Sequence, residues 1–406
     1  FAPAAGILGS KSSMDGFADP RFETVADAFR RQLEGTDGGA ALAVFHGGEP
    51  VVDLWGGNRT DDGDPWEADT LAMCFSTTKG VASAALHLQY EAGLVDYDER
   101  VSTYWPEFAQ NGKQDITVRH VLCHEAGLHR VRSVIDDAHE MLDWDHMVTT
   151  LAAERPAYQP GTRNGYHALT YGWLVGEIVR RVTGRPLSEV IASDLDARLG
   201  LDGLYLGCPP AQRHRVAPLA PMRLLGPSVP EGIHRLRMGV VEGVGRTLAL
   251  AGSPLNIRRT LNALAPRGME DVVAGSEIMD ASIPAANGFF TARALATMYA
   301  VYAGKGALGD VRLFSPETVR RIGSRQNSRP DLVLVMPMQW RLGYHRIFGA
   351  PDGFGHFGFG GSGAWADPTR DLAVAMVCNR GTGTPIGDAR LIRLSRVVIE
   401  AADDAA

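Results

Sequence analysis

Segments with the pattern of β-strands stand at both ends of this chain, and segments with the pattern of helices fill most of the sequence between them. The predicted strands cover residues 41–45, 51–55, 340–344, 363–366 and 372–378. Amphipathic helices at 22–33 and 389–402 accompany these two groups of strands. Because a sheet has to bury at least one face, this order predicts an α+β fold. One antiparallel sheet, built from both chain ends, is covered by helices and carries an inserted helical domain.

The middle of the chain divides into a helical part and an irregular part. Helices are predicted at residues 81–89, 117–124, 146–154, 168–182, 187–199, 291–303 and 316–322. Residues 208–290 are rich in Pro, Gly and Arg, which predicts a long irregular segment able to wall a pocket. A length of 406 residues suits two domains. We therefore expect an α/β domain from residues 1–75 and 291–406 and a mainly helical domain from residues 76–290.

Charge and composition narrow the classes of partner. The net charge of -7 and a pI near 6.0 argue against a nucleic-acid partner, because no basic patch is present to neutralise phosphates. No apolar run reaches the length of a membrane span. Residues 1–13 lack a basic start followed by a long apolar stretch, so we expect a cytoplasmic location. The sequence leaves the oligomeric state open, with a homodimer as one alternative.

Ser76 and Lys79 stand three residues apart where the helix at 81–89 begins, so their side chains share one helical face. A serine hydroxyl is a poor nucleophile until a neighbour takes its proton, and the free amides at a helix start favour negative charge on its oxygen. Lysine can take that proton only if its pKa falls from about 10.4 to near 7, which burial promotes. Only four of the 40 Lys and Arg residues are lysines, which makes a lysine in an apolar helix unusual here. By itself, the tetrapeptide fits an N-cap serine and a solvated lysine equally well.

Two further segments could complete such a site. Tyr166 follows the turn-rich segment 160–165, and a phenol with a lowered pKa beside a lysine can accept the serine proton or pass one to a leaving group. A glycine-rich run from His356 to Gly363 precedes a predicted strand, where small residues would let a substrate receive backbone hydrogen bonds. Each segment has a simpler alternative, namely a packing tyrosine and a glycine-rich hairpin that binds nothing.

Taken together, these segments resemble the serine β-lactamase-like superfamily, and most closely its family VIII carboxylesterases, which are related to class C β-lactamases and DD-peptidases. Ser76-Thr77-Thr78-Lys79 resembles the Ser-x-x-Lys motif, and the likeness spans nearly the whole chain. Tyr166 stands where the Tyr-x-Asn motif falls, and His356-Phe357-Gly358 where the Lys-Thr-Gly or His-x-Gly motif falls. The resemblance implies a β-lactamase/DD-peptidase-like fold in which Ser76, Lys79 and Tyr166 cleave short-chain carboxylic esters through an acyl-enzyme on the serine.

The resemblance also implies roles for other residues. The backbone amides of Ser76 and Phe359 are expected to form the oxyanion hole. The candidates for binding a small-molecule ester substrate are His356, Phe357, Gly358 and Trp340. No cofactor and no metal are expected.

Two departures from the β-lactamase pattern bear on the substrate. Ala168 stands where the β-lactamases carry the asparagine of Tyr-x-Asn, and His356 stands where many carry lysine. Both lost groups hold the amide and carboxylate of a β-lactam or peptidoglycan stem, so a simple ester is favoured. The alternatives are an acyltransferase, an amide or β-lactam hydrolase on the same scaffold, and a catalytically silent binding homologue.

Other patterns point less strongly to function. Residues 358–363 satisfy Gly-x-Gly-x-x-Gly, but a strand follows where a dinucleotide site requires a helix. Ser362 lacks the final glycine of a nucleophile elbow, so we interpret it as a loop serine. His120 and His124 share a helical face, but Leu128 occupies the position where the zinc-protease motif needs its second histidine. The scattered cysteines form no Cys-x-x-Cys pair and predict reduced, buried thiols; they are Cys74, Cys123, Cys208 and Cys378.

Overall fold

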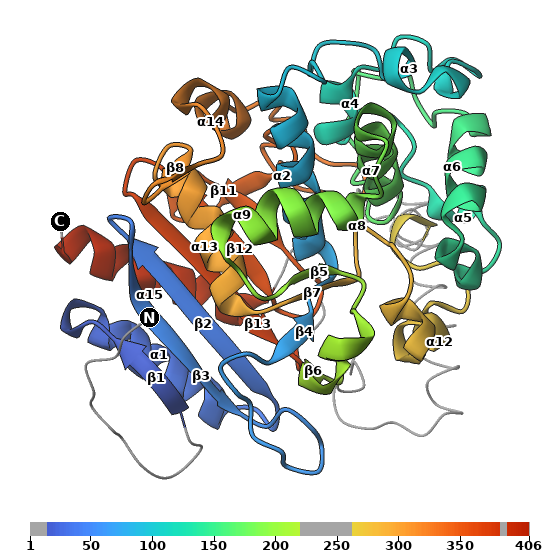
Figure 1. The fold of residues 1–406 in the computed structure, drawn as a ribbon. Coiled ribbons are helices and arrows are strands. Elements are labelled where there is room, and N and C mark those ends of the chain that lie inside the picture. The colour runs from blue at the N-terminus through green and yellow to red at the C-terminus, as the bar shows by residue number, and fades with distance from the viewer. Residues whose placement is uncertain (1–13, 220–261, 382–387, 406) are drawn as a thin grey trace, which may run out of the picture.

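A large antiparallel sheet is built from the two ends of the chain (Figure 1). The structure is a computed structural model that describes residues 14–219, 262–381 and 388–405. In these residues the large sheet has seven strands in the order β1-β3-β2-β13-β12-β11-β10, each antiparallel to its neighbours. The strands are β1 (Met14–Ala18), β2 (Gly39–His46), β3 (Glu49–Gly57), β10 (His345–Ile347), β11 (Ala350–Phe357), β12 (Gly363–Asp367) and β13 (Leu372–Cys378). The predicted sheet from both chain ends is confirmed.

The two chain ends meet where β2 pairs with β13 at the centre of the sheet, with Leu372 opposite His46 and Cys378 opposite Ala40. Side chains alternate between two cores along β2. Leu42 and Val44 belong to one hydrophobic cluster, and Ala43 belongs to the other. Because both faces are covered, the central strands read as continuous apolar runs.

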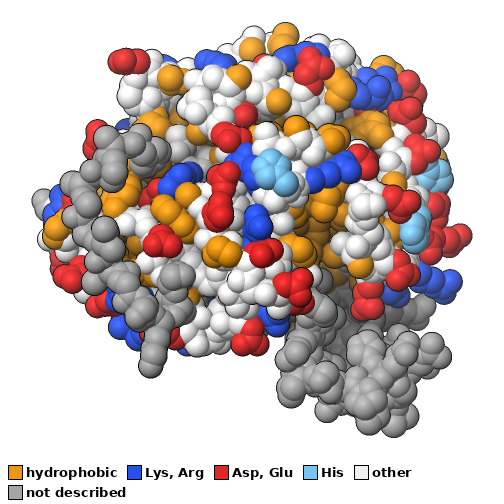
Figure 2. All heavy atoms as spheres, turned by 60° about the horizontal axis from the view of Figure 1, so that its bottom comes forward, with side chains coloured by type: hydrophobic (Ala, Val, Ile, Leu, Met, Phe, Trp, Pro, Cys, Tyr) orange, Lys and Arg blue, Asp and Glu red, His pale blue; other side chains and the backbone are white. Residues whose placement is uncertain are grey.

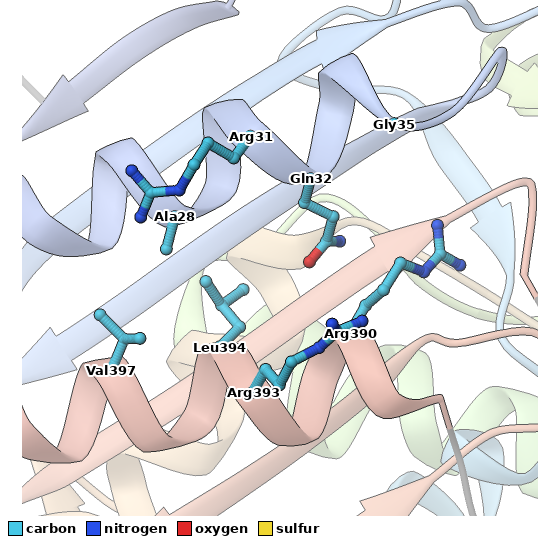
Figure 3. A pocket seen from close by; sticks show the side chains of 8 residues that line it. All are labelled: Ala28, Arg31, Gln32, Gly35, Arg390, Arg393, Leu394 and Val397. Atoms are coloured by element: carbon cyan, nitrogen blue, oxygen red, sulfur yellow. The ribbon is translucent and has the colours of Figure 1, made fainter.

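Helices cover the sheet on both faces (Figure 1). Helices α1 (Glu23–Glu34) and α15 (Ala389–Ala405) pack side by side on one face, and α13 (Ala292–Ala303) packs on β2, β12 and β13 from the other. A shallow groove runs between α1 and α15 (Figure 3). Its lining residues are Ala28, Arg31, Gln32, Gly35, Arg390, Arg393, Leu394 and Val397.

The inserted part of the chain is centred on α2 (Thr78–Glu91), whose residues from Thr78 to Gln89 are all buried. It packs against α7 (Thr170–Thr183). The shorter helices are α3 (Val101–Tyr104), α4 (Val118–Leu122), α5 (Val131–Val134), α6 (Trp144–Ala153), α8 (Leu187–Val190), α9 (Ala197–Leu199), α12 (Met269–Ala274) and α14 (Pro316–Gly323). A small sheet contains β4 (Leu71–Met73), β5 (Leu204–Leu206), β6 (Val216–Ala217) and β7 (Gly288–Phe290), and β8 (Ala307–Leu308) pairs with β9 (Val311–Arg312).

Several features differ from the sequence-based predictions. Residues 340–344 do not form a strand, because positive φ angles at Gln339 (51°) and Gly343 (81°) break the extended path. Strand β11 was not predicted, since Pro351, Gly353 and Gly355 mask its pattern. The segment expected to be irregular contains β6, α12 and β7 in its described part, and its residues 220–261 lie outside the described residues.

The mixed charges on the surface and the limited length of the apolar helices agree with what the composition predicts. Positive and negative side chains are interspersed on the face shown in Figure 2. No helix in the described part of the chain is both long and apolar enough to cross a membrane.

Candidate active site

Ser76 lies in a short 3₁₀ turn, Phe75–Thr77, that leads directly into α2. The turn is anchored by β7, because the Cys74 amide donates to the Gly288 carbonyl (2.8 Å) and the Gly288 amide donates to Thr78 Oγ1 (2.9 Å). Phe75 adopts a φ of 44°, a conformation that costs a bulky residue about 1–3 kcal/mol. The strained turn leaves Ser76 half-buried at the start of a helix.

Lys79 is fully buried and points at the serine. Its Nζ atom lies 2.8 Å from Ser76 Oγ and 3.0 Å from the main-chain oxygen of Ala285. Burial holds the pKa of Lys79 well below its usual value, because the charged ammonium form loses its hydration, and this favours the neutral amine. A neutral amine can donate to Ala285 while its lone pair accepts from Ser76. The predicted desolvated lysine beside the serine is therefore present.

Tyr166 approaches the same oxygen from the other side. Its hydroxyl lies 2.8 Å from Ser76 Oγ, its side chain is buried, and Lys79 Nζ lies 5.0 Å from its ring centroid. Burial raises the pKa of this phenol well above its usual value, and the hydrogen bond to Ser76 offsets only part of the rise. The direction is opposite to the lowered phenol pKa considered from the sequence, because burial and the nearby Asp331 carboxylate both disfavour the phenolate. Tyr166 is a hydrogen-bond donor in this state.

The glycine-rich segment packs against the serine turn. Gly358 donates to the Ser362 carbonyl (2.7 Å), which also accepts from Thr77 Oγ1 (3.1 Å). A Cβ atom at Gly358 would lie 2.3 Å from the Cys74 oxygen, so only glycine allows this approach. In the described part of the chain, the half-buried Ser76 and Phe359 have main-chain amides that donate to no protein acceptor. The ring of Phe359 packs against that of Phe75, next to the nucleophile, with centroids 5.9 Å apart.

His356 faces this side of the sheet, with its ring centroid 6.2 Å from that of Tyr166. Its Nδ1 atom donates to the Phe357 carbonyl (3.1 Å), which leaves the Nε2 lone pair without a partner among the described residues. The pKa of His356 lies well below its usual value because of burial first and then of the nearby His345 and Lys79. The imidazole is therefore neutral and presents an acceptor.

Two of the predicted substrate-binding residues, Phe357 and Trp340, have buried rings. Strand alternation turns the ring of Phe357 to the opposite face, where it packs in the cluster formed by α1 and α15. Trp340 is completely buried and stacks on Tyr166, with ring centroids 5.7 Å apart. Neither ring has more than a trace of exposed surface, and the role of the two residues in substrate binding stays a prediction. The sequence pattern did not predict which way either side chain points.

His124 and Ser362, which belong to two of the weaker sequence patterns, both make hydrogen bonds inside the fold. His124 Nδ1 accepts from the His167 amide (3.0 Å), and the His124 ring lies against Tyr166. Ser362 Oγ accepts from the Cys378 amide (3.1 Å) inside the fold. Ser362 lies between β11 and β12, outside both strands, which fits its interpretation as a loop serine.

Sequence reasoning missed Asp331, a buried carboxylate that accepts the Tyr166 amide (3.1 Å). Asn164 and Trp340 also donate to this carboxylate. Its weak sequence signal is a proline-aspartate pair in a loop, which no motif distinguishes from an ordinary turn.

The family model described as Beta-lactamase matches residues 25–397, and the chain belongs to this family. It is 40% identical to the esterase/beta-lactamase LipL of Mycobacterium tuberculosis over 370 residues, which cover 90% of this chain and 82% of LipL. A crystal structure of a family VIII carboxylesterase superposes with a TM-score of 0.83 and 32% identity, covering 96% of this chain and all of that one (100%). A penicillin-binding protein homologue from Caulobacter crescentus superposes with a TM-score of 0.81 and 34% identity, covering 96% and 100% of the two chains.

Proposed function

We propose that this chain is a serine carboxylesterase that cleaves short-chain esters through an acyl-enzyme on Ser76. The observation that carries the proposal is the placement of Ser76 Oγ between Lys79 Nζ and the Tyr166 hydroxyl, at 2.8 Å from each. Burial favours the neutral amine of Lys79, which can take a proton, and the protonated phenol of Tyr166, which can give one.

Acylation follows from these two states. Ser76 Oγ attacks the ester carbonyl while its proton moves to Lys79 Nζ. The amides of Ser76 and Phe359 stabilise the oxyanion, each such donor being worth about 10²–10³ in rate. As the C–O bond breaks, Tyr166 protonates the alcohol oxygen, and the lysine ammonium returns a proton to the phenol. The products of this half-reaction are the free alcohol and the acylated serine.

Deacylation uses the same groups in the reverse sense. A water in the place vacated by the alcohol attacks the acyl carbonyl and gives its proton to the Lys79–Tyr166 pair. Collapse of the second tetrahedral intermediate breaks the bond to Ser76 Oγ, which takes a proton back from the pair. The acid leaves and the serine is restored. The two titratable groups act as one unit, so the pH dependence belongs to the pair.

The electrostatics of the site favour a neutral substrate. Lys79 contacts the serine and His356 lies against the Tyr166 ring, and burial disfavours the charged form of both. Ala168 brings no amide where the β-lactamases carry asparagine. A substrate carboxylate would lose its hydration here without gaining a cation from either residue, which is costly. A simple ester carries no such charge.

The experiment compares the wild type with Ser76→Ala. We expect the wild type to hydrolyse p-nitrophenyl acetate and butyrate with an initial burst, and to gain one phosphonyl group in intact-mass measurements after treatment with a fluorophosphonate. Ser76→Ala should lose both, whereas Ser362→Ala should keep the adduct on the peptide that contains Ser76. Wild-type turnover by Ser76→Ala would refute the proposal.

A second candidate activity is β-lactam hydrolysis, favoured by the 40% identity to a protein named as an esterase and beta-lactamase. Nitrocefin turnover at a kcat/KM comparable to that for butyrate esters would support it. An acyltransferase would instead be recognised by ester products that increase when an alcohol competes with water. A silent binding homologue would give neither burst nor adduct.

A further inference from the structure

A buried carboxylate lies behind the tyrosine of the site. Asp331 is 2% exposed and belongs to the loop between α14 and β10. Its Oδ1 atom accepts three main-chain amides, from Tyr166 (3.1 Å), Val333 (2.8 Å) and Leu334 (3.0 Å). The Oδ1 atom of Asp331 thus holds both the turn that follows Asp331 and the main chain of Tyr166.

The second oxygen holds the surroundings of the tyrosine ring. Asp331 Oδ2 accepts from Asn164 Nδ2 and from Trp340 Nε1, each at 3.3 Å. The indole of Trp340 stacks on Tyr166 with an angle of only 9° between the ring planes. The Leu332 amide also donates to the Asn164 carbonyl (2.9 Å), which ties the loop to the segment that leads into the tyrosine.

We propose that Asp331 is a positioning residue that holds the Tyr166 hydroxyl at Ser76 by fixing the tyrosine at both its main chain and its ring. The hydroxyl is at the far end of a long side chain, so small errors in the main chain or the ring plane would move it out of hydrogen-bond range of Ser76. This inference rests on the proposed function, because it gives Asp331 a role only through the proton transfer by Tyr166.

The carboxylate is the group that fits all these donors. Both of its oxygens accept, whereas an asparagine would present an NH₂ group to one of the two donor sets. In Asp331→Asn, either the amides facing Oδ1 or the side chains facing Oδ2 lose their acceptor. The substitution keeps the size of the side chain, so it tests hydrogen bonding rather than packing.

A matched control is Asp367, at the end of β12 remote from the glycine-rich segment. It is fully buried and accepts from the amide (2.9 Å) and hydroxyl (2.7 Å) of Thr369 and from the guanidinium of Arg370 (2.8 Å). Asp367→Asn therefore also removes a buried carboxylate, but one that does not contact the tyrosine. Because Asp367→Asn also removes an ion pair, a kcat loss caused by general destabilisation would appear in this control as well.

The experiment is a double-mutant cycle on p-nitrophenyl butyrate hydrolysis with Asp331→Asn, Tyr166→Phe and the double variant, alongside urea unfolding. We expect Asp331→Asn to lower kcat at least about 10-fold, with KM changed less than about 3-fold. In the Tyr166→Phe background, the same substitution should lower kcat by less than about 2-fold. Asp367→Asn should keep kcat within about 2-fold of the wild type. Trp340→Phe, which keeps a stacking ring but loses the indole N–H, should show a smaller kcat loss with the same non-additivity.

Two results would overturn the inference while leaving the proposed function intact. One is an unchanged kcat in both Asp331→Asn and Trp340→Phe, and the other is the same fold-loss from Asp331→Asn with and without the phenol. An absence of Ser76-dependent turnover in the wild type would overturn both proposals together.

Discussion

Lys79 and Ser76 are in contact through their reacting atoms, with Nζ 2.8 Å from Oγ, although the lysine side chain has no exposed surface. Burying an amine beside a hydroxyl costs free energy unless the amine is neutral. The same burial that lowers the pKa of Lys79 is what makes it available as a base, so stability and reactivity are linked at this residue.

The first prediction concerns pH and Lys79. The base must be unprotonated, so kcat/KM for butyrate esters should rise with pH through the lowered pKa of the lysine. Tyr166 contacts the same oxygen and His356 lies against the tyrosine ring, so both share in the profile. Lys79→Arg stays charged at every accessible pH and should lose about 10²–10⁴ in kcat/KM without regaining it at high pH. Initial rates from pH 5 to 10 test this. An activity that falls steadily with rising pH would contradict a lysine base.

The second prediction is that Lys79→Met changes stability with a definite sign. Between the lowered folded-state pKa and about 10.4, the unfolded chain binds a proton at Lys79 that the folded chain does not, so the free energy of unfolding rises with pH across this window. Removing the amine should raise the urea midpoint at pH 7, and the gain should shrink as the pH approaches 10. A loss of stability that is independent of pH would show that the buried amine is not neutral.

A third prediction follows from the buried histidines. Burial lowers the pKa of His87 to about 3 and of His345 to about 4, and it also lowers the pKa of His124 and His356. Below about pH 6.5 the unfolded chain takes up protons at these residues while the folded chain does not, so stability should fall as the pH drops from 6.5 toward 4. Urea unfolding at several pH values measures the slope, which should be smaller in His345→Gln. A midpoint that stays constant from pH 7 to 4 would count against this account.

For Tyr166 we expect Tyr166→Phe to lower kcat about 10²–10⁴-fold, because the proton donor to the leaving alcohol is removed. The ring stays stacked on Trp340, so the free energy of unfolding should change by only about 1 kcal/mol, the size of one hydrogen bond. Steady-state kinetics and urea unfolding of the same preparation separate the two effects. Retained kcat in a folded variant would show that the phenol is dispensable.

The final prediction is steric. In Gly358→Ala the new methyl group would meet the Cys74 carbonyl at 2.3 Å and push the glycine-rich segment away from the serine turn. We expect a loss of about 1–3 kcal/mol in stability and at least a 10-fold lower kcat/KM. Gly35→Ala is the control, because its added carbon would lie 3.7 Å from the nearest atom. Equal behaviour of the two variants would rule out a tight approach at residue 358.

Much of the fold followed from local pattern. The runs at 41–45 and 372–378 lie in the central strands β2 and β13, and the periodic segment after Ser76 is the buried helix α2. Strand β1 was missed because Gly16, with a φ of 108°, interrupts a segment of only five residues. Residues 340–344 were predicted as a strand from their apolar spacing, although the positive φ at Gly343 prevents it.

By itself, the sequence determined the pairing of a hydroxyl with an amine, because three residues along a helix fix Ser76 and Lys79 on one face. Only the tertiary structure decided how the remaining groups act. Tyr166 is brought to Ser76 across 90 positions of the chain, and its protonation depends on how completely other segments bury it. The anchor at Asp331 lies 165 positions further on. Burial and long-range contact are properties of the packed molecule, so no local pattern could reveal them.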